Sequence, residues 1–252
     1  MGRLRKLTTI VYGASGPVGA GIALALGREG SNVVVHYNKN EAAAADIVAR
    51  IEAGGSRALA LSADITDEAA LNGLLKRTLD QFGAVDCVVN SAHGAFEPKA
   101  VADLEWDDWR VHLDAQKGHF LICKTVLPIM RRQGSGRLVF VSGGLSHRLY
   151  AGFSAFSTVK AGLNAFSKTL ALEEGRHGIT INIVAPGKVS DSGAAPTSDP
   201  WLGIEKHQLA AAPLGRYATG ADVAEAVLFF LSPTAAGMTG QVLFVAGGEV
   251  MA

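Results

Sequence analysis

The segment SAFSTVK, residues 154–160, joins a serine-rich turn to a predicted helix. Phe156 and Lys160 are four residues apart, so they share one face of that helix and could jointly line a site. A lysine ammonium group supplies a compact positive charge, whereas a phenyl ring can neither give nor take a proton. The pair therefore predicts a cationic site whose aromatic neighbour lacks a hydroxyl group.

A second stretch, IVYGASGPVGAGIALALG, places Gly13, Gly16 and Gly19 between an apolar run and a helical pattern. Glycines allow the backbone to approach a pyrophosphate closely, and a helix N-terminus offers free N–H groups and a positive dipole end. We therefore predict that this turn binds a nucleotide. A tight turn without a ligand is the alternative.

Apolar runs alternate with longer helical patterns along the whole chain. The runs are rich in Val, Ile and Leu without clean alternation, which is typical of strands covered on both faces. Alternating strands and helices favour βαβ units, and right-handed crossovers give a doubly wound parallel sheet, a Rossmann-type α/β/α sandwich in three layers. The predicted strands are residues 8–13, 32–37, 57–62, 85–90, 137–142, 180–185 and 241–246.

The bulk composition is typical of a globular protein. Of the 252 residues, 48% are hydrophobic and 18% are charged, and α/β folds often reach this length as one domain. We therefore predict a single dinucleotide-binding domain over 1–252. Lys and Arg balance Asp and Glu at 23 each, which argues against nucleic-acid or membrane partners.

The sequence also bears on the cellular location of the protein and on the state of its cysteines. No run approaches the ~18 apolar residues of a membrane span, and the N-terminus lacks a signal-peptide pattern. Cys87 and Cys123 lie in apolar surroundings, as buried thiols in a reducing compartment would. We expect a cytoplasmic protein, and we predict no metal site.

The glycine turn resembles the Thr-Gly-x-x-x-Gly-x-Gly loop of the classical short-chain dehydrogenase/reductase family. Tyr12 stands in place of the threonine and Pro17 in place of the middle glycine. Proline is accepted in a first helical turn, where its missing N–H would have no helical partner. The cofactor-binding residues that this resemblance implies in the loop are Gly13, Ser15, Gly16, Val18 and Gly19.

Four later segments resemble the same family in the same order. SADITD (62–67) is similar to its adenine-binding segment, and VVNSAHG (88–94) to its Asn-Asn-Ala-Gly turn. VAPGKVSD (184–191) is similar to the Pro-Gly segment over the nicotinamide, and TGQVLFVAGG (239–248) to its last strand. The further cofactor-binding residues implied are Asp64, Ile65, Asn90, Ala92, Lys160, Pro186, Gly187 and Val189.

The end of the second strand bears on the choice between the two nicotinamide cofactors. Rossmann sites for NAD place an acid there, which accepts a hydrogen bond from the ribose 2′-hydroxyl. This sequence has Tyr37 at that position, followed by Asn38 and Lys39. No carboxylate repels a 2′-phosphate, and Lys39 could pair with it, so NADP(H) is favoured over NAD(H). A solvated surface lysine is the alternative for Lys39.

The family's carbonyl chemistry uses a tyrosine that donates a proton, a lysine that lowers its pKa and binds the nicotinamide ribose, a serine that orients substrate and an asparagine that maintains a proton relay. The resemblance places the lysine at Lys160, but the other three positions at Phe156, Gly143 and Ala115. General acid–base help is worth ~10²–10⁴-fold in rate. Ordinary ketone reduction should be slower by at least that factor unless another donor substitutes.

Several polar residues could supply a substitute donor. Ser146 and His147 lie on the segment before the helix, and His93 follows the fourth strand. Each could equally be a turn or surface residue, and Tyr150 would point away from Phe156 on a continuous helix. The catalytic residues that we predict are Lys160, Ser142 and Tyr150.

Three functions remain open at this stage. The favoured one is an NADP(H)-dependent oxidoreductase that transfers a hydride to a conjugated C=C bond of an enone or enoyl substrate, because an enolate can be held electrostatically. The second is an ordinary ketone or alcohol oxidoreductase with a relocated proton donor. The third is a catalytically inactive nucleotide-binding homologue, against which the retained Lys160 argues.

Two further expectations concern partners. The irregular segment 187–212 is predicted to be a substrate loop, and Trp201, Leu202 and Ile204 within it suggest a partly apolar small molecule. The stretches WDDWRVHLDAQKGHFLICKTVLPIM and STVKAGLNAFSKTLALEEG resemble the family's interface helices. The resemblance therefore implies a homotetramer or homodimer.

Overall fold

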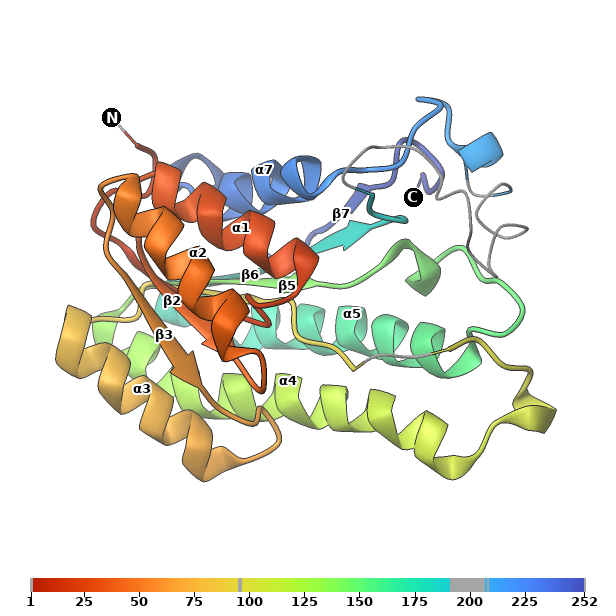
Figure 1. Ribbon diagram of the computed structural model, residues 1–252, viewed down its shortest axis with the longest axis horizontal. Coiled ribbons are helices and arrows are strands. Elements are labelled where there is room, and N and C mark those ends of the chain that lie inside the picture. Colours follow the sequence, from red (N-terminus) through yellow and green to blue (C-terminus); the bar gives the residue numbers. More distant parts are fainter. Residues whose placement is uncertain (1, 95–96, 191–206, 208, 252) are drawn as a thin grey trace.

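A single parallel sheet forms the middle layer of the protein (Figure 1). This computed structural model describes residues 2–94, 97–190, 207 and 209–251. The strand order is β3-β2-β1-β4-β5-β6-β7, which confirms the predicted doubly wound sheet, and each predicted strand is found within two residues of its predicted ends. The strands are β1 (Thr8–Tyr12), β2 (Asn32–Tyr37), β3 (Ala58–Ser62), β4 (Cys87–Asn90), β5 (Gly136–Val141), β6 (Ile179–Pro186) and β7 (Val242–Val245).

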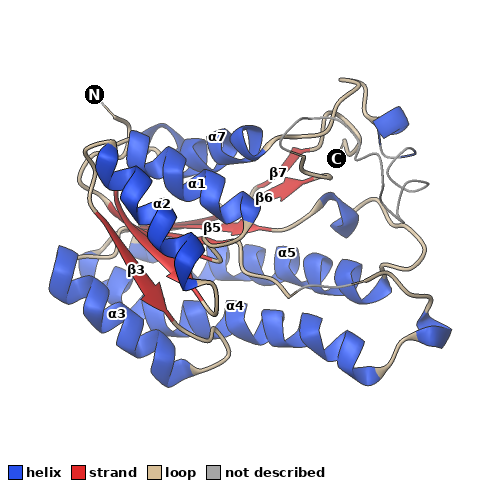
Figure 2. Cartoon of the chain, in the orientation of Figure 1, coloured by secondary structure: helices blue, strands red, loops and turns tan. Residues whose placement is uncertain are grey.

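Helices cover both faces of this sheet (Figure 2). On one face lie α1 (Pro17–Arg28), α2 (Glu41–Ala53) and α7 (Gly220–Leu231). On the other face lie α3 (Glu68–Phe82), α4 (Trp106–Gln133) and α5 (Ser154–Glu174). Short 3₁₀ turns are found at Val101–Asp103, Gly144–Ser146, Gly175–His177 and Pro233–Ala235.

The strands are apolar on both sides because each side contributes to a separate core. Val11 and Val35 pack with Leu26 of α1 on one face. Ile10 and Val34, their neighbours along the strands, pack on the opposite face with helices α3, α4 and α5. This double burial explains why the runs lack an alternating pattern.

The carboxyl ends of all the strands lie at one edge, since every strand pair in the sheet is parallel. The strand order reverses between β1 and β4, where the chain crosses to the other half of the sheet. Open α/β sheets bind their ligands outside such a switch point. The predicted site residues follow the ends of the strands at this edge.

Two other expectations can be compared with the structure. Cys87 and Cys123 are both buried and unbridged, as expected, and burial raises the pKa of the Cys87 thiol to about 12. None of the described helices has the length and apolar character needed to cross a membrane.

Candidate active site

The glycine turn after β1 packs tightly against the end of β4. Gly13 has a φ of 74°, and a Cβ atom there would lie 2.7 Å from the backbone nitrogen of Ala92. A Cβ atom on Gly19 would collide with the carbonyl oxygen of Gly13. Pro17 is exposed at the first position of α1, so its ring stays clear of this close packing. The turn therefore keeps the bare backbone that a pyrophosphate needs, despite the proline.

A buried histidine, which the sequence analysis did not predict, anchors this turn. The Gly13 N–H donates to Nδ1 of His36 at 3.1 Å, and the Ala14 N–H donates to the His36 carbonyl at 3.0 Å. The other ring nitrogen, Nε2, donates to the Ala63 carbonyl at 2.9 Å. Burial lowers the pKa of His36 to about 4, so the ring is neutral and joins the glycine turn after β1 to the segment after β3.

The positions implied for the adenosine half of a dinucleotide lie beside this turn. Asn38 and Lys39 are exposed directly after β2. Asp64, directly beyond β3, accepts hydrogen bonds from the N–H and hydroxyl of Thr66, and these bonds lower its pKa. Ile65 is half-buried and packs against the core under α4.

The turn after β4 is held by its asparagine. Asn90 Oδ1 accepts the Ala92 N–H at 3.1 Å, and its Nδ2 contacts His119 Nδ1 at 2.6 Å. Pro186, the last residue of β6, is buried, and Gly187, directly after the strand, is half-exposed. Val189 pairs with Ala218 in an isolated bridge.

Lys160, the residue that the resemblance assigns to the family lysine, lies on α5. Its side chain is 5% exposed, and its Nζ donates to the Val141 carbonyl at 3.1 Å. Burial lowers the pKa of Lys160 to about 8. The Ser142 hydroxyl donates to the Lys160 carbonyl at 3.3 Å, so Ser142 is turned toward the backbone of α5.

Gly143 and Phe156, which the sequence predicted at the serine and tyrosine positions, are adjacent in space. A Cβ atom on Gly143 would lie 3.6 Å from the Phe156 ring, and Nζ of Lys160 lies 5.3 Å from the centre of that ring. The edge of Phe156 meets His112 of α4, with ring centres 5.8 Å apart at 83°. Gly143, Phe156, Lys160 and His112 are therefore neighbours in the structure, and Phe156 and Gly143 contribute no polar side-chain atom to this group.

Three histidines lie close enough to Lys160 for its charge to affect them. His112 and His119 are three residues before and four after Ala115, a spacing that puts them on one face of α4. The His93 Nδ1 donates to the Gly94 carbonyl at 2.9 Å. Burial lowers the pKa of all three rings, and the Lys160 charge lowers it further. Only His93 was a candidate from the sequence, although the helical spacing of His112 and His119 from Ala115 could have indicated that they share its face.

Tyr150 precedes α5 and is directed at a residue that the sequence analysis did not predict. Its hydroxyl donates to Oε1 of Glu249 at 3.0 Å, and burial raises the pKa of Tyr150 to about 12. The other suggested donors have partners: the Ser146 hydroxyl donates to the Gly143 carbonyl, and His147 packs against Phe244 of β7.

A cavity of about 470 Å³ borders Phe156 at the N-terminal ends of α4 and α5. Leu104, Val111 and Phe153 give it apolar walls. Lys99 and Asp108, which also line it, form an ion pair at 2.7 Å. This cavity can therefore take a partly apolar molecule next to Phe156.

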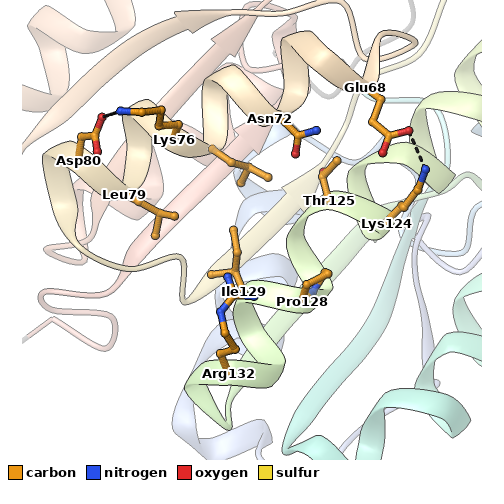
Figure 3. A pocket seen from close by; sticks show the side chains of 11 residues that line it. Glu68, Asn72, Lys76, Leu79, Asp80, Lys124, Thr125, Pro128, Ile129 and Arg132 are labelled. Atoms are coloured by element: carbon orange, nitrogen blue, oxygen red, sulfur yellow. Dashed lines mark hydrogen bonds and ion pairs between the residues drawn. The ribbon is translucent and has the colours of Figure 1, made fainter.

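A second cavity, of about 420 Å³, lies between α3 and α4 (Figure 3). The Glu68–Lys124 ion pair crosses its rim at 2.7 Å. None of the predicted site residues lines it, so we do not assign it to the active site. Much of the predicted substrate loop, including Asp191, Trp201, Leu202 and Ile204, falls outside the described residues.

Comparisons with known proteins give a consistent result. A family model described as enoyl-(acyl carrier protein) reductase matches residues 13–249. The chain is 35% identical to a 3-oxoacyl-[acyl-carrier-protein] reductase of Synechocystis, over all of both chains. It is also 35% identical to a hydroxynaphthalene reductase-like protein of Metarhizium robertsii, over 98% of this chain and 97% of that one.

Solved structures agree with these matches. A short-chain dehydrogenase of Burkholderia cenocepacia in complex with NADP is 31% identical, with a TM-score of 0.88 over 98% of this chain and 99% of that one. A 7α-hydroxysteroid dehydrogenase solved with NADH is 29% identical, with the same TM-score over 99% and 96%. The fold, the glycine turn and these full-length similarities show that the chain belongs to the short-chain dehydrogenase/reductase family of oxidoreductases.

Proposed function

We propose that this protein is an NADP(H)-dependent oxidoreductase with a non-standard active site, and that its hydride acceptor is a conjugated C=C bond. The observation that carries the proposal is the contrast at α5, where Lys160 is retained and buried while its aromatic neighbour is Phe156. A conjugated acceptor does not require a proton at the step in which it takes up hydride. The negative charge that develops is delocalised as an enolate, which a nearby cation can stabilise.

The residues at the carboxyl edge of the sheet fit a nicotinamide dinucleotide. Gly13 and Gly19 leave a turn that any Cβ atom would fill, and the first N–H groups of α1 have no helical partner. These groups would hold the pyrophosphate, and Asp64 with Ile65 would flank the base. When bound, the cofactor supplies the hydride.

NADP(H) is favoured because Tyr37 takes the place of the acid at the end of β2. Asn38 and Lys39 are exposed there and can reach a 2′-phosphate, and charge-assisted contacts of this kind are strong. Among the structural neighbours, the Burkholderia protein is solved with NADP and the steroid dehydrogenase with NADH. The preference therefore rests on the residues of this chain.

Lys160 would stabilise the charge that develops on the substrate oxygen. Because the pKa of Lys160 is lowered to about 8, most molecules carry this side chain as an ammonium group near neutral pH. Its Nζ is held by the Val141 carbonyl, which fixes the charge beside Phe156. Preorganised charges of this kind stabilise an oxyanion effectively in a site that excludes water.

A second candidate function is reduction of a ketone by a relocated proton donor. The observation that favours it is the hydrogen bond of Tyr150, whose pKa of about 12 keeps the phenol protonated at neutral pH. The relatives include 3-oxoacyl reductases by name, whereas the family model is described as an enoyl reductase. Both acceptor classes therefore deserve a matched assay.

We further propose a partly apolar substrate and a homo-oligomer, as a dimer or tetramer. The walls of the cavity beside Phe156 support the first proposal. Phe120 on α4 and Leu172 on α5 are 51% and 86% exposed, and a second copy of the chain would cover them. Sedimentation equilibrium, compared with a Phe120→Glu variant, tests the association.

The proposed function is tested by cofactor binding followed by a paired substrate assay. Calorimetric titration should give tighter binding of NADPH than of NADH. NADPH oxidation should then be faster with 2-cyclohexenone than with cyclohexanone. Lys160→Ala should abolish it, whereas Lys168→Ala, an exposed lysine on the same helix, should not. Binding of neither cofactor would instead support an inactive homologue, and faster ketone turnover would favour the second candidate.

A further inference from the structure

We propose that Glu249 is the proton donor of this active site and that Tyr150 is the residue that positions it. This inference rests on the proposed function, because it names the group that completes the reduction there. Glu249 lies after β7, close to the end of the chain. It replaces in function, from a different element, the hydroxyl that Phe156 lacks.

The contacts of Glu249 place its carboxyl at the predicted nicotinamide segment. Its Oε2 atom lies 3.1 Å from the point where a Cβ atom on Gly187 would be. A Cβ atom on Gly144 would lie 3.7 Å from the Gly187 Cα atom. A Cβ atom on Gly143, the preceding residue, would lie 3.6 Å from the Phe156 ring. The Gly143–Gly144 turn therefore lies between Phe156 and the Gly187 segment that the Glu249 carboxyl borders.

The two oxygens of the Glu249 carboxyl have different neighbours. Oε1 accepts the Tyr150 hydroxyl at 3.0 Å, and Arg148 fixes the backbone by donating to the Glu249 carbonyl at 3.1 Å. Oε1 is thus committed to Tyr150, while Oε2 faces Gly187. A proton on Glu249 therefore belongs on Oε2, the oxygen that is directed at the predicted cofactor segment.

The surroundings favour the protonated carboxyl. Burial raises the pKa of Glu249, and it outweighs the opposite effects of the Tyr150 hydrogen bond and the Arg148 charge. Arg148 and Tyr150 face it from the segment after β5, while Gly187 brings no charge from the segment after β6. Tyr217 faces Tyr150 from the segment before α7 and raises the pKa of Tyr150. Carboxyl groups with raised pKa values are typical general acids.

The proton transfer can be written in full. A hydride drawn from the reduced cofactor forms a C–H bond at the β-carbon of the enone, and the π electrons shift to leave a negative charge on the carbonyl oxygen. The O–H bond at Oε2 breaks, its proton forms an O–H bond with that oxygen, and its electron pair stays on the carboxylate of Glu249. The carboxylate then regains a proton from water.

The test combines Glu249→Gln with Tyr150→Phe, and uses Glu225→Gln, an exposed glutamate on α7, as the matched control. The first readout is the infrared carbonyl band of the cofactor-free protein between about pH 5 and about pH 8. The wild type should show a protonated carboxyl band that Glu249→Gln removes and Glu225→Gln keeps. No such band in this range would overturn the proposal.

The second readout is the pH profile of 2-cyclohexenone reduction with NADPH. Turnover should fall at high pH as Glu249 loses its proton. Glu249→Gln should lower kcat by ~10²–10⁴-fold and abolish that alkaline limb while NADPH binding stays unchanged. Tyr150→Phe should move the limb to higher pH, because it removes a hydrogen bond that lowers the pKa of Glu249.

The outcomes distinguish a failure of the role proposed for Glu249 from a failure of the proposed function. An active wild type with an unchanged Glu249→Gln profile would overturn the role of Glu249 and leave the reductase function standing. A wild type that binds NADPH but oxidises it with neither enone nor ketone would remove the proposed function, and this role with it. A Tyr150→Phe variant with slower turnover and an unmoved limb would limit Tyr150 to a structural role.

Discussion

Nζ of Lys160 lies 5.3 Å from the centre of the Phe156 ring and donates a hydrogen bond to the Val141 carbonyl. The ammonium group is therefore buried beside an apolar ring, and burial lowers the pKa of Lys160. A buried charge of this kind has a measurable cost to stability.

Replacing Lys160 by methionine should stabilise the protein near neutral pH. Burial lowers its pKa from 10.5 to about 8, so the unfolded chain binds the proton more tightly than the folded one. The cost is complete below about pH 8 and is relieved as pH rises toward 10.5. Because this difference corresponds to roughly 3 kcal/mol, Lys160→Met should raise the free energy of unfolding by up to that amount at neutral pH.

Urea unfolding at about pH 7 and about pH 10 measures this effect. The gain should shrink at the higher pH, and Lys168→Met should give no comparable gain at either pH. Equal destabilisation by Lys160→Met at both pH values would mean that the ammonium group is not penalised in the folded state.

Restoring the missing hydroxyls should restore ketone reduction. A Cβ atom on Gly143 has room, since it would lie 3.6 Å from the Phe156 ring, so Gly143→Ser and Phe156→Tyr are compatible with each other. The double variant should raise kcat/KM for cyclohexanone by ~10²–10⁴-fold, measured by NADPH oxidation. Phe82→Tyr, at the last residue of α3, should leave kcat/KM for cyclohexanone unchanged. No gain from the double variant would mean that Ala115 and His112 have reshaped the site more deeply.

The sheet and the glycine turn after β1 could be predicted, because short stretches of sequence determine both of them. Residues 32–37 form β2 as expected, since a strand buried on both faces must be a short continuous apolar run. Gly13 and Gly19 are similarly dictated by close backbone contacts within one turn. Short-range patterns of this kind can be read from the sequence without knowledge of the rest of the fold.

The contacts of Glu249 and His36 could not be predicted, because each contact joins residues that are far apart in the sequence. Glu249 meets Tyr150 across 99 positions of sequence, through a turn in which Gly247 and Gly248 both have positive φ. His36 is one residue of a strand, and only the fold shows that its ring bonds the glycine turn. Phe156 likewise led to the prediction that the usual acid is absent, but the sequence did not show which groups lie near that position.

Reversing the charge of Lys39 should weaken NADPH binding selectively. Lys39 is exposed directly after β2, where it would pair with the 2′-phosphate. A hydrogen bond to a charged group contributes about 1.5–3 kcal/mol, so Lys39→Glu should raise the Kd for NADPH by ~10–100-fold and that for NADH much less. Calorimetry with both cofactors checks this, with Lys168→Glu as the control. An equal loss for both cofactors would remove Lys39 from 2′-phosphate recognition.

Replacing His36 by leucine should destabilise the protein and loosen the cofactor turn. The change leaves the Gly13 N–H and the Ala63 carbonyl without their partners, at a cost of about 1–3 kcal/mol for each buried group. NADPH binding should weaken as well, because Gly13 holds the turn open for the pyrophosphate. His177→Leu, at a half-buried residue in the turn after α5, is the matched control.

The pH dependence of the same variant gives an independent check. The pKa of His36 is lowered from 6.5 to about 4, so the folded state binds this proton less tightly than the unfolded chain. Its neutral ring therefore imposes no titration cost above about pH 6.5, and stability falls as pH drops toward 4, by roughly 3 kcal/mol in all. Urea unfolding between these values should show a shallower decline for His36→Leu than for the wild type or His177→Leu. An identical decline in all three proteins would show that other groups, such as the buried His119, dominate the acid response.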